Sequence, residues 1–170
     1  MNRSAGFAPI AGDDAVVLIL GTLPSVRSLE KGEYYGHPQN AFWKIMGDLF
    51  DAGPELGYAE RVERLRACKV AVWDVLSSSV RPGSMDAAID SSTATPNDFA
   101  AFFASHPGIR QVFFNGRKSA ELFERFVAAN GVSTDLNCVT LPSTSPAFAA
   151  MSYGDKLSAW SQVRNVVQAC

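Results

Sequence analysis

The fold is decided by a short apolar stretch, Ala15-Val16-Val17-Leu18-Ile19-Leu20, which lies between Asp13-Asp14 and Gly21. An uninterrupted apolar run of this kind is typical of a strand covered on both faces, as in a parallel sheet. Three other runs resemble it and end in polar or turn-forming segments, namely Lys69-Val70-Ala71-Val72-Trp73, Gln111-Val112-Phe113-Phe114 and Cys138-Val139-Thr140-Leu141. The sequence therefore predicts a mainly parallel sheet of four strands.

Segments with apolar residues at helical spacing lie between these runs. We expect helices over 41–50, 58–68, 116–129 and 155–168, and one that opens at Pro96 with Thr95 as its N-cap. The alternation of strands and helices predicts a single α/β domain spanning residues 1–170. Three irregular stretches, 21–38, 74–95 and 141–153, follow predicted strand ends. In open α/β sheets this edge is where ligands bind.

Composition excludes several classes of protein. The chain has 170 residues, of which 47% are hydrophobic and 19% charged, which excludes a disordered chain, a coiled coil and a collagen-like repeat. The sequence contains no run of about 18 uncharged apolar residues, the length that a membrane-spanning helix needs. Its first 15 residues do not resemble a signal peptide. The three cysteines, Cys68, Cys138 and Cys170, are far apart and form no CxxC motif. We expect buried, reduced thiols and no metal site.

The charge balance limits how the chain could bind nucleic acid. With 15 Lys+Arg against 17 Asp+Glu, the formal net charge is −2. A protein that binds DNA through bulk charge is strongly basic. Any DNA contact must therefore come from a local cluster of arginines and lysines, helped by helix N-termini.

The three irregular stretches contain motifs that together resemble a known family. The first stretch carries Gly21-Thr22-Leu23-Pro24-Ser25 and then Tyr34-Tyr35-Gly36-His37-Pro38-Gln39-Asn40-Ala41-Phe42-Trp43, and the last carries Leu141-Pro142-Ser143-Thr144-Ser145-Pro146-Ala147. In kind and order these turns resemble the uracil-DNA glycosylase superfamily, and within it the hypoxanthine-DNA (deoxyinosine) glycosylase branch. The spacing between the strands also fits, so the resemblance covers nearly the whole chain.

The resemblance implies a fold and a reaction. The fold is a three-layer α/β/α domain whose four-stranded parallel sheet lies between helices. The reaction is hydrolysis of the N-glycosidic bond of a deaminated base, chiefly hypoxanthine, that is flipped out of DNA. Such a site needs an aromatic platform, a polar group that reads the base edge, a held water and contacts to the DNA backbone. No metal or organic cofactor is expected.

Asn40 is the predicted catalytic residue. Many members of the superfamily carry Asp or Asn just after the first strand, where this chain has Thr22-Leu23. The hypoxanthine branch is similar to this chain in having an Asn before its Phe-Trp pair, which implies that Asn40 orients the attacking water. The alternative is that Asn40 only caps the helix that begins at Ala41.

The base itself is expected to meet residues of the first two stretches. The resemblance implies that Tyr35 or Tyr34 forms the aromatic platform, although one of them could belong to the core, and that Gly21 and Thr22 contact the base. Asp74 ends the second strand, and its carboxylate could accept the ring N–H that hypoxanthine has and adenine lacks. The alternative for Asp74 is a turn cap.

Contacts to the DNA backbone are expected from hydroxyl and basic side chains. The candidates are Ser25, Arg81, Arg117, Lys118, Ser143, Thr144 and Ser145. Arg117 and Lys118 could instead lie on a solvated helical turn. His37 could contact a phosphate or the base, or be structural. Phe148, which follows the last motif where the branch has Asn, could fill the gap left by a flipped base or anchor its loop.

Other functions remain open at this level. One alternative is a uracil or xanthine remover of the same fold, and another is a DNA-binding member with weak catalysis, because Leu23 and Leu141 stand where relatives have polar residues. An esterase using Ser143 is disfavoured, since the sequence has no G-x-S-x-G motif. The expected partner is DNA containing deaminated bases, without a membrane contact. We expect a monomer in the cytoplasm, associated with the nucleoid during repair.

Overall fold

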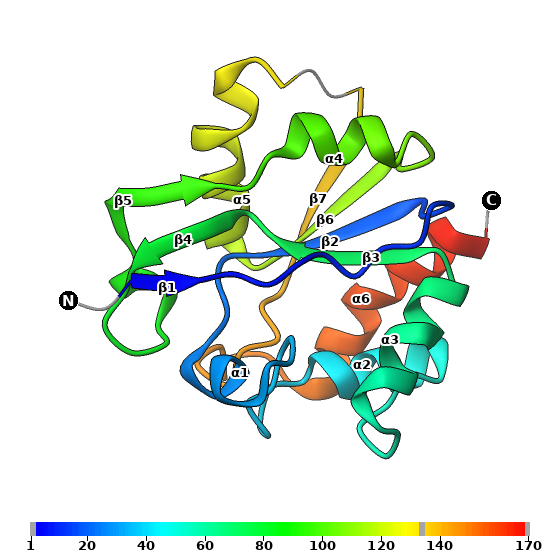
Figure 1. Cartoon of the computed structure of the whole chain (residues 1–170). Coiled ribbons are helices and arrows are strands. Elements are labelled where there is room, and N and C mark those ends of the chain that lie inside the picture. Colours follow the sequence, from blue (N-terminus) through cyan, green and yellow to red (C-terminus); the bar gives the residue numbers. More distant parts are fainter. Residues whose placement is uncertain (1–2, 133–134, 169–170) are drawn as a thin grey trace.

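The computed structural model describes residues 3–132 and 135–168, and its central sheet has the predicted four parallel strands. They stand in the order β3-β2-β6-β7 (Figure 1). Their bounds are Val17–Gly21 for β2, Val70–Asp74 for β3, Gln111–Asn115 for β6 and Asn137–Leu141 for β7. The register places Gly21 beside Asp74 and Asn115 beside Leu141, so the ends of the strands meet at one edge.

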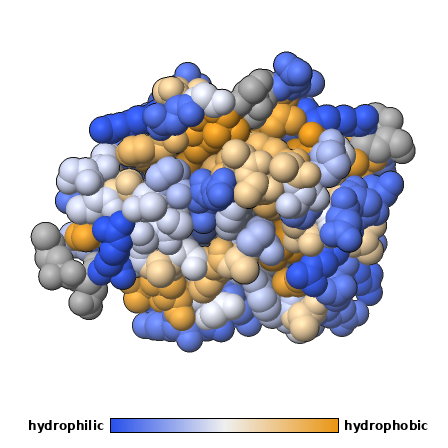
Figure 2. All heavy atoms as spheres, turned by 45° about the horizontal axis from the view of Figure 1, so that its top comes forward, coloured by the Kyte–Doolittle hydropathy of each residue, from blue (hydrophilic) through white to orange (hydrophobic). Residues whose placement is uncertain are grey.

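Helices cover both faces of this sheet, which confirms the three-layer fold. On one face lie α2 (Phe42–Phe50), α3 (Tyr58–Ala67) and α6 (Tyr153–Gln168), and on the other α4 (Phe99–Ser105) and α5 (Arg117–Phe126) (Figure 1). Because both faces are covered, every residue of β2, β3 and β6 is buried. With α4 and α5 turned forward, apolar side chains gather near the middle of the surface and hydrophilic ones around its rim (Figure 2).

A second sheet was not expected. It is antiparallel, with the order β1-β4-β5, and consists of β1 (Arg3–Ala5), β4 (Leu76–Val80) and β5 (Asp90–Pro96). β4 follows β3 after the single residue Val75, whose N–H donates to Gly21 O. The stretch 74–95 is therefore mostly a hairpin and not an irregular loop. Its tip, residues 81–89, includes a short 3-10 helix, Asp86–Ala88.

Several predicted element ends are corrected by the structure. Thr95 and Pro96 belong to β5, and α4 is capped by Asp98, whose carboxylate accepts the N–H of Ala101 at 3.1 Å. A short helix, α1 (Val26–Lys31), lies within the stretch 21–38. The helix expected over 116–129 ends at Phe126, and the last helix begins two residues earlier than predicted, at Tyr153.

Two remaining expectations concern cysteines and membranes. Cys68 is half-buried but Cys138 is exposed, because β7 is an edge strand, so the prediction of buried thiols is wrong for Cys138. Cys170 lies outside the described residues. Within residues 3–132 and 135–168, no helix combines the length and apolar character needed to cross a bilayer.

Candidate active site

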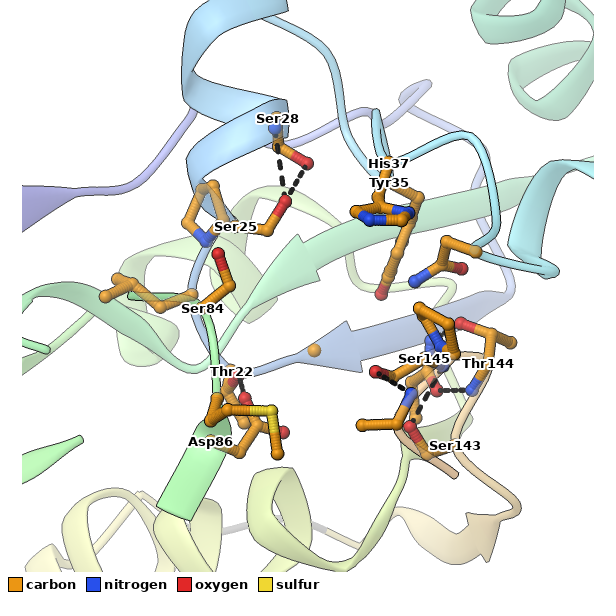
Figure 3. Close-up of a pocket in the computed structure, with 18 of the residues that line it drawn as sticks. Thr22, Ser25, Ser28, Tyr35, His37, Ser84, Asp86, Ser143, Thr144 and Ser145 are labelled. Atoms are coloured by element: carbon orange, nitrogen blue, oxygen red, sulfur yellow. Dashed lines mark hydrogen bonds between the residues drawn. The ribbon is translucent and has the colours of Figure 1, made fainter. Parts of the chain in front are cut away.

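A pocket lies at the carboxyl ends of the parallel strands, where the irregular stretches meet. Its cavity volume is about 410 Å³. Most of the predicted site residues line it, namely Gly21, Thr22, Ser25, Tyr34, Tyr35, His37, Asn40, Asp74, Arg81, Ser143, Thr144, Ser145 and Phe148 (Figure 3). Arg117 and Lys118 do not line it. The structure therefore brings together residues that lie more than 120 positions apart in the sequence.

Asp74 provides a buried carboxyl group in the pocket. Its side chain is 4% exposed, and its Oδ2 has no hydrogen-bond partner among the described residues. The pKa of Asp74 is raised to about 7, chiefly by burial and also by the carboxylate of Asp86, while the guanidinium of Arg81 opposes the rise. The backbone of Asp74 is held separately, because Asn97 Nδ2 donates to its carbonyl oxygen at 2.8 Å. A turn cap would need a hydrogen bond to the carboxyl group of Asp74, and none is found among the described residues.

Gly21 makes room for this carboxyl group. A Cβ atom at position 21 would lie 2.6 Å from Asp74 Oδ1 and 2.9 Å from Tyr35 Oη. Both distances are shorter than ordinary van der Waals contacts. Only glycine therefore allows the carboxyl of Asp74 and the hydroxyl of Tyr35 to approach the end of β2 this closely.

The two adjacent tyrosines have different surroundings. The hydroxyl of Tyr34 donates to Ala8 O at 2.8 Å, and its backbone oxygen accepts the indole N–H of Trp43 at 2.7 Å, so Tyr34 is a core residue at the edge of the pocket. Tyr35 stacks on Phe42, with 4.0 Å between ring centroids. Its hydroxyl is buried and has no partner that meets hydrogen-bond geometry among the described residues. Burial, followed by the charge of Asp74, raises the pKa of Tyr35, and the nearby Asn115 amide lowers it.

Asn40 caps α2, and the cap leaves polar atoms of its amide free. Its Oδ1 accepts the backbone N–H of Phe42, the first residue of α2, at 2.9 Å. Because a backbone N–H can only donate, this bond fixes the orientation of the amide. A carbonyl oxygen has a second lone pair, and Nδ2 donates to none of the described residues. The capped amide can therefore still hold a water molecule in the pocket.

His37 lies on the same side of the pocket as Tyr35 (Figure 3). Its Nδ1 accepts the backbone N–H of Gln39 at 3.1 Å, so Nδ1 carries no proton in this arrangement. The ring is half-buried and leaves Nε2 available to a ligand. The bond to Gln39 supports a structural contribution without excluding a contact to substrate.

The hairpin tip contributes residues that the sequence analysis did not find. Asp86 accepts a hydrogen bond from Thr22 Oγ1 at 2.7 Å and lies 3.5 Å from Arg81 Nη1. Ser84 Oγ accepts the N–H of Val26 at 2.9 Å, and the exposed Met85 lies between these two anchors. In the sequence Asp86 is only a charged residue within a polar stretch, and this pattern does not indicate a pocket.

Arg81 differs from its predicted role. Its side chain is buried, and its guanidinium donates to the carbonyl oxygens of Leu23 and Pro24 and pairs with Asp86. Burial lowers the pKa of Arg81, while Asp86 and Asp74 raise it. The prediction that Arg81 contacts the DNA backbone is therefore corrected: the side chain fastens the hairpin tip to the first turn.

The turn after β7 is held from inside the sheet. Asn115 Oδ1 accepts the N–H of Thr144 and Asn115 Nδ2 donates to Thr144 Oγ1, both at 2.9 Å. Thr144 is 1% exposed, so its hydroxyl is a structural group and the predicted backbone contact is corrected. Ser143 Oγ and Ser145 Oγ accept backbone N–H groups within the turn and keep their own hydrogens for a ligand.

The remaining predicted contacts lie around the pocket. Ser25 caps α1 by accepting the N–H of Ser28 at 3.1 Å. Arg117 is exposed at the start of α5. Lys118 forms an ion pair with Glu121, with 3.9 Å between Nζ and Oε2. Phe148 is 38% exposed, and the buried Lys156 of α6 donates to its carbonyl oxygen at 2.7 Å. The alternative of a fully buried loop anchor is therefore wrong for the ring of Phe148.

A family model and several known proteins are similar to this chain over most of its length. The model of the uracil DNA glycosylase superfamily matches residues 9–165. A hypoxanthine DNA glycosylase of Methanosarcina barkeri is 34% identical over 135 residues, which cover 79% of this chain and 84% of that protein. A second, from Methanosarcina acetivorans, is 33% identical over 159 residues, covering 93% and 96%. The solution NMR structure of a candidate uracil DNA glycosylase from Methanosarcina acetivorans is similar with a TM-score of 0.80 and 30% identity, covering 98% of this chain and 99% of that one.

Proposed function

The chain belongs to the uracil DNA glycosylase superfamily, and we propose that it hydrolyses the N-glycosidic bond of a deaminated base in DNA, chiefly hypoxanthine. The names of the two relatives support hypoxanthine as the base, because their alignments span most of both chains. The reaction makes an abasic site and free base, the first products of base excision repair. It needs only water as co-reactant.

The observation that carries the proposal is a set of unpaired polar groups in the pocket. Among residues 3–132 and 135–168, three buried side-chain atoms lack a hydrogen-bond partner: Tyr35 Oη, Asp74 Oδ2 and Arg81 Nε. All three residues line the same cavity. A buried polar group without a partner costs about 1–3 kcal/mol, so such groups are rare unless a ligand pairs with them. The edge of a purine or pyrimidine base carries the donors and acceptors that this set lacks.

The proposed mechanism uses these groups in sequence. The flipped base enters the cavity with its hydrogen-bonding edge toward Asp74, whose carboxylate accepts the ring N–H. The bond between the sugar and the base breaks, the electron pair leaves with the base, and the sugar develops oxocarbenium character. Asn40 holds the water that attacks this sugar carbon, and the departing base takes up the proton that the water loses. An amide is too weak a base to deprotonate water, so its contribution is position.

The same edge explains how adenine would be rejected. Hypoxanthine and uracil both present a ring N–H next to a carbonyl group. Adenine presents an unprotonated ring nitrogen at the corresponding place, and a carboxylate would repel it. Asp74 therefore favours the deaminated base over its normal counterpart.

DNA contacts are proposed around the mouth of the cavity. Ser143 and Ser145 offer hydroxyl groups to phosphate oxygens, and Arg117 and Lys118 add positive charge at the start of α5. The Ser25 hydroxyl donates to Ser28 Oγ at 3.1 Å, so it would have to turn to reach a phosphate. Phe148 is proposed to enter the gap that the flipped base leaves, as apolar wedges do. Lys156 fixes the backbone from which this ring projects.

Binding should depend on salt in a way that identifies the basic cluster. With Arg81 buried, we expect Arg27, which is exposed on α1, to act with Arg117 and Lys118 and neutralise roughly two or three phosphates. The slope of log affinity against log salt concentration should then be about −2 to −3. Replacing Arg117 and Lys118 together by alanine should reduce the magnitude of this slope by about one to two. A control pair, Arg64→Ala with Arg66→Ala on α3, should leave it unchanged. Fluorescence anisotropy between 50 and 200 mM salt measures the slope. An unchanged slope in the Arg117→Ala, Lys118→Ala variant would contradict the assignment of these two residues to DNA contacts.

The proposed function is tested by base release from defined oligonucleotides. Duplexes holding a single inosine, uracil or xanthine are incubated with the protein, and free base is measured by mass spectrometry. We expect hypoxanthine release to be the fastest. Faster release of uracil or xanthine would identify the alternative substrate, and DNA binding without release of any base would identify a member with weak catalysis. An oligonucleotide with adenine at the same position serves as the control.

Assembly and location complete the proposal. We propose that the protein acts as a monomer on DNA in the cytoplasm, at the nucleoid during repair. The proposed mechanism draws on residues of one chain and needs no second one. Sedimentation of the protein with and without a short duplex measures its stoichiometry, and two chains per lesion would contradict this part of the proposal.

A further inference from the structure

The carboxyl group of Asp74 and the hydroxyl group of Tyr35 converge on one point above Gly21. Asp74 Oδ1 and Tyr35 Oη both lie within 3 Å of the position that a Cβ atom of Gly21 would occupy. We propose that the Tyr35 hydroxyl is a specificity-determining group that donates to the carbonyl oxygen of the base, next to the ring N–H that Asp74 accepts. This inference rests on the proposed function, since it names the edge that the same pocket reads.

The position of the hydroxyl is fixed by the surroundings of its ring. The ring stacks on Phe42 with planes 25° apart, and the next residue, Gly36, donates its N–H to Ser28 Oγ at 2.9 Å. Tyr35 also has a φ of 53°, in the left-handed region that bulky residues rarely adopt. A strained backbone conformation of this kind persists only where the surrounding structure enforces it, and such residues cluster at functional sites. The close-up shows the Tyr35 side chain reaching into the cavity (Figure 3).

The chemistry of the hydroxyl suits a donor. Burial and the neighbouring Asp74 charge raise the pKa of Tyr35, so its proton stays in place at neutral pH. Tyr35 then offers one O–H, and the Asp74 carboxylate offers a lone pair. Together they match an edge that has a carbonyl next to a ring N–H, as in hypoxanthine and uracil. Adenine has an amine and a bare nitrogen there, so both contacts are lost at once.

The pair formed by Asp74 and Tyr35 should not distinguish hypoxanthine from guanine. Guanine has the same carbonyl and ring N–H as hypoxanthine, and it differs by an amino group on the neighbouring carbon. The two groups above Gly21 therefore separate 6-oxopurines from adenine, and rejection of guanine requires a different part of the pocket. A role in stacking alone would not make this distinction, because every base has a face on which a ring can stack.

The test removes the hydroxyl and keeps the ring. Tyr35→Phe should lower the single-turnover rate of hypoxanthine release from inosine DNA by about three- to tenfold, the value of one neutral hydrogen bond. Tyr34→Phe is the matched control: it removes the neighbouring hydroxyl, which bonds to Ala8 in the core, and should leave the rate within twofold at a temperature where the variant is folded. Binding to a duplex with a non-cleavable abasic analogue should stay within twofold for Tyr35→Phe, because that DNA has no base edge to read.

Two further measurements keep the test decisive. The melting temperature of Tyr35→Phe should equal or exceed that of the wild type, because the lost hydroxyl is buried and unpaired. Free hypoxanthine should bind three- to tenfold more weakly to the complex of this variant with abasic-analogue DNA, a readout that needs no catalysis. Wild-type-like rate and hypoxanthine binding in Tyr35→Phe, with a large rate loss only in Tyr35→Leu, would assign the ring to stacking and overturn the inference. A wild-type protein that releases no base would instead contradict the proposed function.

Discussion

Replacing Asn40 by alanine is expected to lower the single-turnover rate on inosine DNA by roughly 10² or more, which corresponds to about 2.7 kcal/mol in the barrier. In the proposed mechanism the side chain holds the attacking water through the oxygen lone pair and the Nδ2 hydrogens that the cap of α2 leaves free. A group that acts through the water contributes chiefly in the transition state, so DNA affinity should change little.

The structure explains why so much should depend on one amide. Leu23 is 6% exposed and Leu141 is 2% exposed, so neither position offers a polar group to a water in the pocket. His37 has already used its Nδ1 on the backbone of Gln39. Asp74 is buried and faces the base edge in the proposed mechanism. Asn40 is then the neutral side chain left to orient the nucleophile.

Folding must be separated from chemistry in this experiment. Loss of the hydrogen bond to Phe42 should cost about 1 kcal/mol of stability, so the variant should remain folded at 25 °C. Gln39→Ala is the matched control, because it shortens an exposed side chain next to Asn40 and should keep the wild-type rate. Circular dichroism, binding to abasic-analogue DNA and base release are measured on one preparation. A folded Asn40→Ala protein that binds DNA and still releases hypoxanthine within about threefold of wild type would place the water elsewhere.

The central sheet could be predicted because its signal is local. The runs that became β2, β3 and β6 are apolar through their middle without alternation, and this pattern is typical of a strand covered on both faces. β4 gave no such signal, since Ser77, Ser78 and Ser79 follow one another in its middle. Their polar groups are satisfied across the hairpin, for example by Ser79 Oγ donating to Asp90 O at 3.1 Å. That partner becomes visible only when the chain has folded.

The candidate site divides in the same way. Residues that follow directly on a strand, such as Asp74, or that belong to a recognisable turn, such as Asn40 and Tyr35, could be placed at the pocket from the sequence. The role of Arg81 could not be predicted, because its partners Leu23 and Pro24 lie 58 and 57 residues away in the sequence. Their carbonyl oxygens bind the guanidinium inside the protein, where the sequence predicted that it would contact DNA. Thr144 was misjudged for a related reason, since its hydroxyl is used by Asn115 of a neighbouring strand.

The protonation state of Asp74 should control the rate on inosine DNA. The groups around its carboxyl are Asp86, which with burial brings the pKa of Asp74 to about 7, and Arg81, which opposes this rise; the Tyr35 hydroxyl is also close. The carboxylate accepts the ring N–H more strongly than the protonated carboxyl does, so the rate should rise with pH and level off above about pH 8. One unit below the pKa, near pH 6, the rate should be lower than on the plateau by up to roughly tenfold.

Two substitutions separate the charge from the acceptor. Asp74→Leu keeps the approximate volume and removes the acceptor, so the plateau rate should fall by roughly 10- to 100-fold, the value of a hydrogen bond to a charged group. Asp74→Asn keeps an acceptor that does not titrate, so the rise in rate around pH 7 should disappear. Because the amide can turn and donate to a bare ring nitrogen, this variant should also discriminate less well against adenine. Single-turnover rates on inosine, uracil and adenine duplexes between pH 5.5 and 8.5 measure all three effects.

Both variants should be more stable than the wild type at high pH. A carboxyl whose pKa is higher in the folded than in the unfolded protein binds more protons when folded, so its contribution to stability is present below about pH 4 and is lost as the pH rises through about 7. Asp74→Leu and Asp74→Asn remove this penalty and should raise the free energy of unfolding at pH 8 by more than about 1 kcal/mol, with a smaller gain at pH 5. Thermal and urea unfolding at both pH values measure the difference. Variants that are less stable at pH 8 and keep the wild-type pH–rate profile and base preference would show that Asp74 supports the turn after β3 and does not read the base.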